Sequence, residues 1–117
     1  MVYKNMIQYR SQGGIEMTLQ IETPDKETLS SICKKYHIRK LAIFGSALRN
    51  DFGPDNNIDI LVEFDSKHVP GFFKLIDIQD ELSLLFKQPV DLRTPEDLSR
   101  YFREDVIENA EVQYAEG

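Results

Sequence analysis

Two neighbouring polar positions are the residues of this sequence best suited to metal chemistry. Asn57 and Asp59 lie two residues apart in the stretch 57–64, whose alternating pattern predicts a strand. Side chains at this spacing point to the same face of a strand, so the pair can share one metal ion or two adjacent ions. Oxygen ligands in this arrangement can hold magnesium against a polyphosphate. Taken alone, Asp59 has a plainer interpretation as a solvated carboxylate.

A second carboxylate, Asp91, comes from the predicted strand 89–93. Val90 and Leu92 are expected to face the core there, and Asp91 the opposite side. If the two strands are neighbours, Asp91 comes within metal-sharing distance of Asp59. It can then act as a general base on an attacking hydroxyl, or as a ligand that positions it. Its plainer interpretation is a solvated aspartate near a turn.

A turn that suits a phosphate group precedes the first pair. The apolar run 40–44 predicts a strand that stops at Gly45, and Ser46 begins a short predicted helix, 46–50. The start of a helix offers unpaired N–H groups and a partial positive charge, and glycine allows a phosphate to approach the backbone. Such turns are common, so this motif alone favours a structural role.

The elements that must position these residues follow from caps and apolar periodicity. A helix is expected from Pro24 to about Tyr36, capped by Thr23 and carrying Cys33 on its apolar stripe. A second long helix is predicted at 72–86, and the two phenylalanines at its start, 72 and 73, are interpreted as core rather than as a partner-binding patch. A turn-rich loop, 51–56, separates the first two strands.

The C-terminal part of the chain is expected to complete the fold. The stretch 94–97 starts a further helix by a cap followed by proline, and 106–114 is a last helix fragment or an edge strand. Strands and helices in this order predict an α/β (α+β) fold, a small mixed sheet flanked by helices.

Length and composition predict one globular domain. Residues 22–117 are expected to form it, and residues 1–21 are interpreted as a flexible or accessory N-terminal extension. The single cysteine, Cys33, is interpreted as a core residue that fits a reducing compartment. No apolar run approaches the ~20 residues of a membrane span, and no stretch of the signal-peptide type is present. A cytoplasmic location without membrane contact is therefore expected.

The charge balance bears on the partners. The chain has 20 acidic and 14 basic residues, which gives a net charge of −6. Because proteins that grip nucleic acids usually present a basic surface, direct binding of a long polynucleotide is not expected. A nucleotide carried by metal ions, or a basic protein partner, fits this balance better.

Taken together, the motifs are far more specific than any one of them. Gly45-Ser46, ten intervening residues, position 57 with Asp59, and Asp91 on a later strand resemble the signature of the DNA-polymerase-beta-like nucleotidyltransferases. Within that superfamily the chain resembles the minimal nucleotidyltransferase family over roughly residues 24–114. The segments that carry this resemblance are 44–49, 53–55, 58–64, 89–92 and 103–106.

The resemblance implies a polymerase-beta-like fold, an activity and a set of roles. Gly45 and Ser46 would bind the triphosphate of ATP, and Arg49 would contact phosphate or the partner. Position 57, Asp59 and Asp91 would be the catalytic and magnesium-binding triad. Members of the family commonly act as antitoxins that transfer AMP from ATP onto a tyrosine of a HEPN-domain ribonuclease toxin.

This sequence departs from the family pattern at position 57, where aspartate is expected and Asn57 is found. The neutral amide is a poor magnesium ligand, so transfer should be slowed by several orders of magnitude. Three interpretations remain open: a deliberate substitution that disables the site, natural decay to an antitoxin that only binds, or sufficient metal binding through Asp59 and Asp91.

Two further functions compete with protein adenylylation. A non-catalytic antitoxin would silence its toxin by contact alone and would not need nucleotide. Transfer to a small molecule, as in the aminoglycoside nucleotidyltransferases, would need an extra acceptor-binding domain, for which 117 residues leave no room.

Overall fold

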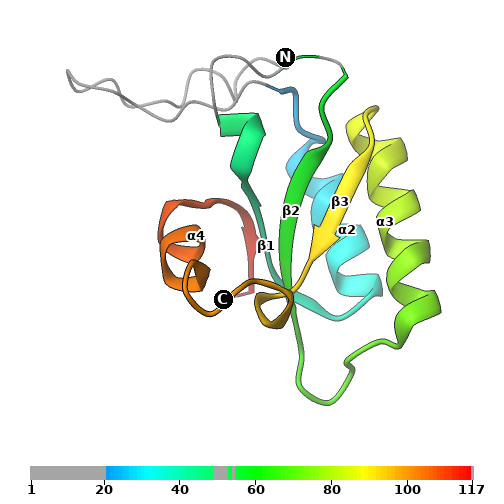
Figure 1. Cartoon of the computed structure of the whole chain (residues 1–117). Helices are drawn as coiled ribbons and strands as arrows, with labels where there is room; N and C mark the ends of the chain where they lie inside the picture. The colour runs from blue at the N-terminus through cyan, green and yellow to red at the C-terminus, as the bar shows by residue number, and fades with distance from the viewer. Residues whose placement is uncertain (1–20, 49–52, 54, 117) are drawn as a thin grey trace.

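A four-stranded mixed sheet is the centre of the protein. The computed structural model describes residues 21–48, 53 and 55–116. The strands are β1 (Ile38–Phe44), β2 (Ile58–Phe64), β3 (Val90–Arg93) and β4 (Glu111–Ala115), in the order β3-β2-β1-β4. β1 is antiparallel to β2 and β4, whereas β2 and β3 are parallel. The predicted fold class, a small mixed sheet flanked by helices, is confirmed (Figure 1).

One face of the sheet carries the main hydrophobic core. The long helices α2 (Lys26–Lys35) and α3 (Phe72–Phe86) lie on this face (Figure 1). Apolar side chains of the three elements form one buried cluster, which includes Ile32 and Cys33 of α2, Ile58, Ile60 and Val62 of β2, and Ile78, Leu82 and Phe86 of α3. Cys33 is completely buried, as predicted, and burial raises its pKa to about 12. Ile21 belongs to the same cluster.

The predicted cap of the first helix was wrong by two residues. Asp25, not Thr23, is the N-cap, and its Oδ1 accepts a hydrogen bond from the backbone N–H of Thr28 at 2.8 Å. The helix therefore begins at Lys26, and Pro24 precedes it. The carboxylate accepts from a backbone N–H of the first turn that has no partner within the helix, which is the role of an N-cap side chain.

The helix expected to start at residue 94 is also shorter than predicted. Only a 3-10 turn, η2 (Pro95–Asp97), forms there, closed by the Asp97 carboxylate, which accepts from the backbone N–H of Thr94 at 3.0 Å. Leu98 then takes an extended conformation, which ends the turn. The helix comes later, as α4 (Arg103–Asn109), and β4 follows it as an edge strand. Both alternatives for residues 106–114 are thus realised in succession.

The interpretation of Phe72 and Phe73 as core residues was wrong. Their side chains are 71% and 80% exposed, and their rings meet edge to face. Ile78, Leu82 and Phe86, spaced four residues apart, form the ridge that faces the sheet. The first two residues of α3 lie off this ridge because of the helical period.

None of the helices that the described residues form is long and apolar enough to cross a membrane.

Candidate functional site

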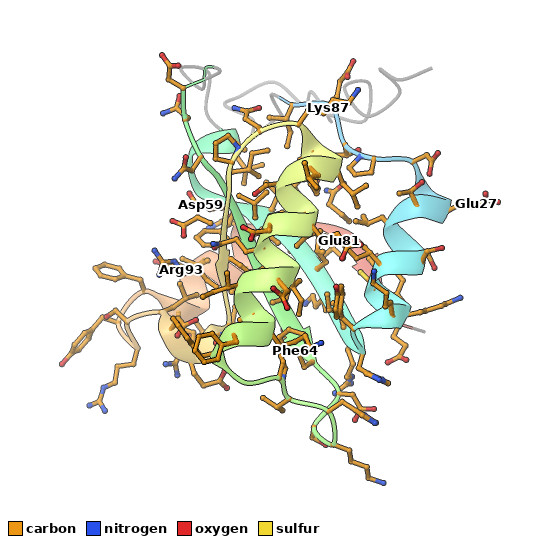
Figure 2. All side chains as sticks on the ribbon, turned by 90° about the vertical axis from the view of Figure 1, so that its right-hand side faces the viewer. Glu27, Asp59, Phe64, Glu81, Lys87 and Arg93 are labelled. Atoms are coloured by element: carbon orange, nitrogen blue, oxygen red, sulfur yellow. The ribbon has the colours of Figure 1, made fainter. Side chains whose placement is uncertain are left out.

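The pairing of β2 with β3 brings the two predicted carboxylates together. In the parallel register Asp59 and Asp91 are direct cross-strand partners, while the preceding pair, Ile58 and Val90, is buried in the core. Neighbouring strands lie ~4.8 Å apart, so the two carboxylates lie side by side on the same face. Figure 2 shows Asp59 and Arg93 on the side of the sheet away from α2.

Gly45 lies directly against Asp59. Phe44, the last residue of β1, pairs with Asp59, and Gly45 follows with a φ of 74°. A Cβ on Gly45 would collide with the Asp59 carboxylate. The glycine is therefore required twice, by its left-handed backbone and by the close approach of the aspartate.

The other predicted nucleotide-binding residues follow Gly45. The segment Gly45–Leu48 forms a single 3-10 turn, η1, rather than the start of a longer described helix. Ser46 belongs to this turn and directly follows Gly45. Arg49 lies outside the described residues, as does the end of the predicted short helix.

Asn57 is exposed and directly precedes β2. The loop before it is held by Gln88, whose Nε2 donates to the backbone oxygens of Gly53 (3.1 Å) and Asn56 (3.0 Å). The backbone N–H of Ile58 donates to the oxygen of Pro89 at 2.8 Å. The residues just before Asn57 are thus hydrogen-bonded to the connection between α3 and β3, the strand that carries Asp91.

Helix α3 supports the strand that carries Asp91. β3 is an edge strand, and two of its N–H groups are bound by α3 side chains: that of Val90 by Ser83 Oγ and that of Leu92 by Gln79 Oε1, both at 2.9 Å. Ser83 Oγ in turn donates to the backbone oxygen of Gln79. These side chains take the place of a neighbouring strand and cover the edge.

An arginine stands next to Asp91. Arg93 is two residues further along β3, and its Nη2 lies 3.2 Å from Asp91 Oδ2. The Asp91 side chain is 35% exposed and that of Arg93 47%. Arg93, Gln88, Gln79 and Ser83 were missed by the sequence analysis, because nothing in the sequence shows which residues a turn or a strand register brings together.

Buried apolar residues lie beside Asp59 on the same sheet face, where Leu61 pairs with Ala42. Leu61, which the alternation of β2 places on the same face as Asp59, is only 4% exposed, and Ala42 and Leu48 are buried although they lie outside the main core cluster. The carboxylates therefore project from a sheet face that is partly covered. Strands hold functional groups more precisely than loops do.

The donor chemistry fits a divalent cation incompletely. Asp59 and Asp91 supply two carboxylates side by side, and Asn57 adds an amide oxygen near the start of β2. Within the described residues, no group of three histidine, cysteine, aspartate or glutamate side chains is arranged to hold a metal. The arrangement thus offers two of the three acidic ligands that the family resemblance implies.

The sequence has relatives among nucleotidyltransferases. The model of the nucleotidyltransferase domain family matches residues 26–112. A provisionally named protein adenylyltransferase of Methanocaldococcus jannaschii is 31% identical over 74 residues, which cover 63% of this chain and 74% of the relative. The protein adenylyltransferase MntA of Thermococcus cleftensis is 32% identical over 59 residues, 50% of this chain and 58% of the relative.

Solved structures agree with this assignment at the level of the fold. A provisionally named minimal nucleotidyltransferase is 25% identical, covers 73% of this chain and 85% of its own, and superposes with a TM-score of 0.60. A toxin–antitoxin structure with AMP-PNP gives a TM-score of 0.62 at 14% identity, and the match covers 78% of this chain and 73% of that one. Because the toxin–antitoxin structure is only 14% identical, its likeness to this chain concerns the fold alone.

Proposed function

The chain belongs to the nucleotidyltransferase domain family, and on this premise we propose that it is an antitoxin that binds ATP and transfers AMP onto a toxin protein. We infer further that the acceptor is a tyrosine of a HEPN-domain ribonuclease. The observation that carries the proposal is the pairing of Asp59 with Asp91 beside Gly45. The names of the relatives, which are protein adenylyltransferases, support the choice of acceptor class.

Each residue of the site has a role in this proposal. Gly45 and Ser46 bind the triphosphate through the backbone of the η1 turn, and Arg49 contacts phosphate or the partner. Asp59 and Asp91, with Asn57 in the third position, would hold magnesium, which would neutralise charge on the triphosphate. Asp91 also accepts or orients the proton of the tyrosine hydroxyl, whose oxygen bonds to the α-phosphorus of ATP as the bond to the departing pyrophosphate breaks.

Asn57 makes the catalytic step slow in this proposal. An amide brings no charge to a site that must balance a metal–triphosphate complex. The rest of the site keeps its geometry, because the loop of Asn57 is held by Gln88 and by the pairing of Ile58 with Pro89. Binding is thus expected to survive better than turnover.

The test compares Asn57→Asp with the unchanged chain in labelled AMP transfer from ATP to the cognate toxin. The variant should transfer at least ~100-fold faster, since electrostatic stabilisation of this kind contributes factors of that size. Asn56→Asp is the matched control, because it adds the same charge one residue away, at a side chain that accepts from the backbone N–H of Gly53. Equal labelling by the Asn57→Asp variant and the unchanged chain would contradict the assigned role of position 57.

The second candidate, an antitoxin that acts by binding alone, is favoured by Asn57 and by the two-carboxylate site. A toxin-protection assay with and without ATP separates the two functions. Protection that needs ATP supports transfer, and equal protection without nucleotide supports binding alone.

A further inference from the structure

Helix α3 has a second apolar side, which points away from the sheet. In Figure 2 this helix lies in front of the sheet, and no helix or strand of the described part of the chain covers it. Its exposed apolar side chains are Phe72, Phe73, Ile76 and Leu84. Because the ridge of the same helix already fills the core, α3 is apolar on two sides. A helix of this kind is typically buried between two structures.

The neighbouring helix shows that the fold does not require a second apolar side. α2 packs on the same face of the sheet, and its exposed residues are all polar or charged: Lys26, Glu27, Thr28, Ser31, Lys34 and Lys35. The solvent side of a surface helix is normally of this type. Exposed aromatic side chains, in contrast, are enriched where proteins contact each other. The outward side of α3 therefore has the composition of an interface.

Two aspartates lie among these apolar residues. Phe73, Asp77, Asp80 and Leu84 are spaced by four, three and four residues, so they form one line along the helix, here called the outer line. Both aspartates are exposed, and neither has an ion-pair partner among the described residues. Lys74, the exposed cation within α3, lies 5.9 Å from the centre of the Tyr36 ring at the end of α2. The outer line is thus apolar at its ends and negatively charged in its middle.

This charge pattern determines which kind of partner fits. A spacing of four and three residues is the one by which a helix packs along another helix. Carboxylates within such a contact are tolerated only when basic side chains face them. The outer line is symmetric about its middle, so the α3 of a second copy would bring aspartates against aspartates in either direction. The pattern therefore favours a basic partner over self-association.

We propose that the outer line of α3 is the surface on which the toxin docks, through a helix with lysine or arginine in its middle and apolar residues at both ends. This inference rests on the proposed function, because the toxin is the partner that this function requires. Gln79 and Ser83 of α3 bind the edge of β3. A toxin docked on α3 thus lies beside the edge strand that carries Asp91.

Removing either kind of contact should weaken toxin binding. Phe73→Ser should raise the Kd by about 30-fold, since aromatic anchors of interfaces contribute factors of this size. Asp77→Asn combined with Asp80→Asn should raise the Kd about tenfold at low salt. The same double variant should make the Kd nearly independent of salt, because salt screens only the charge contacts that are then absent.

The experiment measures binding of the full chain to the purified toxin protein by calorimetry, at low and at high salt. ATP is left out, so that transfer does not contribute. Val112→Ser and Glu27→Gln are the matched controls, because Val112 is an exposed apolar residue of β4 and Glu27 an exposed acid of α2. Neither control should change the Kd. Urea unfolding should give the same midpoint for all variants, since every changed side chain is exposed.

The outcomes separate this inference from the proposed function. If the unchanged chain binds the toxin and the outer-line variants bind it equally well, the docking surface is wrong and the proposed function stands. If the unchanged chain does not bind the toxin, both proposals fail.

The remaining outcomes test the chemistry of the partner. Weaker binding by Phe73→Ser and by the double aspartate variant, with both controls unchanged, supports a basic helix on the outer line. Loss confined to one of the two variants contradicts a partner that is apolar at its ends and basic in its middle. If sedimentation shows that the chain self-associates and that Phe73→Ser abolishes this, a second copy occupies the surface and the proposal is wrong.

Discussion

Gly45 and Asp59 determine each other's conformation. The left-handed backbone of Gly45 ends β1, and the space that a Cβ would fill is taken by the Asp59 carboxylate. A carboxylate held against a backbone in this way has few alternative rotamers. The glycine therefore acts on the site through the direction in which Asp59 points, in addition to any contact with phosphate.

Gly45→Ala should consequently damage both stability and ligand binding. A non-glycine residue at a positive φ costs about 1–3 kcal/mol, and the added methyl must displace Asp59. Gly71→Ala is the control, since a Cβ there meets nothing within 4 Å, and it should cost less than about 1 kcal/mol. Urea unfolding and manganese binding measure the two effects. Equal losses in the two variants would show that the contact with Asp59 is unimportant.

Single residues of the site were predictable where strand alternation alone determines them. The polar faces of the two predicted strands give Asp59 and Asp91, and the parallel register then makes them partners. Arg93 lies on the same polar face, but its pairing with Asp91 depends on side-chain geometry. Gln88 binds the loop before Asn57 only because a turn brings the end of α3 there. Neither interaction leaves a pattern in the sequence.

At the scale of elements, Glu81 joins the two core helices. Its Oε1 accepts from the Tyr36 hydroxyl at 2.7 Å, and its Oε2 accepts from Lys35 Nζ at 2.9 Å. The hydrogen bond from Tyr36, followed by that from Lys35, holds the pKa of Glu81 below its usual range. The same hydrogen bond raises the pKa of the Tyr36 hydroxyl. The end of α2 is thus tied to the middle of α3.

This link predicts a pH dependence of stability. Because the pKa of Glu81 is lower in the folded chain than the unfolded value of about 4.3, its contribution is complete above that pH and is lost as the pH falls through the folded pKa. Glu81→Gln should therefore lower stability at neutral pH and reduce its decline towards pH ~3. Denaturant unfolding at several pH values measures both.

Asp80→Asn is the control for this prediction. Asp80 is exposed and precedes Glu81 on the same helix. Its replacement should leave the acid decline close to that of the unchanged chain. If the two variants have the same pH profile, the link between the helices does not contribute to stability.

The first three strands and the two long helices were predictable from the sequence, but the helices expected at 46–50 and from residue 94 are 3-10 turns where the structure describes them. The ends of the elements and the phase of α3 were not predicted. The N-cap is the residue whose side chain accepts a hydrogen bond from an unpaired N–H of the first helical turn. Asp25 does this, and the predicted Thr23 does not act as the cap. The phase of α3 is decided by the sheet, which takes the ridge of Ile78, Leu82 and Phe86. Phe72 and Phe73 are as apolar as that ridge, so composition could not distinguish them.

At the scale of the whole molecule, the hydrophobic core and the candidate site lie on opposite faces of the sheet. α2 and α3 cover one face and form the core, whereas the candidate carboxylates lie on the other (Figures 1 and 2). The two sides are connected through β3, which carries Asp91 and whose edge is held by Gln79 and Ser83 of α3. Loosening α3 should therefore weaken the site through β3.

Two leucines of α3 provide a matched test of this connection. Leu82 is fully buried and Leu84 is 78% exposed. Leu82→Ala should lower the free energy of unfolding by about 2–5 kcal/mol, because a cavity forms against the sheet. Leu84→Ala should change it by less than about 0.5 kcal/mol.

A further measurement tests whether the core and the site unfold together. Manganese binding to the Asn57→Asp variant, with and without Leu82→Ala, is followed during urea unfolding. In a single cooperative domain the loss of binding should coincide with the loss of helix, and Leu82→Ala should move both transitions together to lower urea. Loss of binding well before loss of helix would mean that β3 detaches from α3 while the core survives. In that case the hydrogen bonds of Gln79 and Ser83 would be too weak to keep Asp91 in place for as long as the core persists.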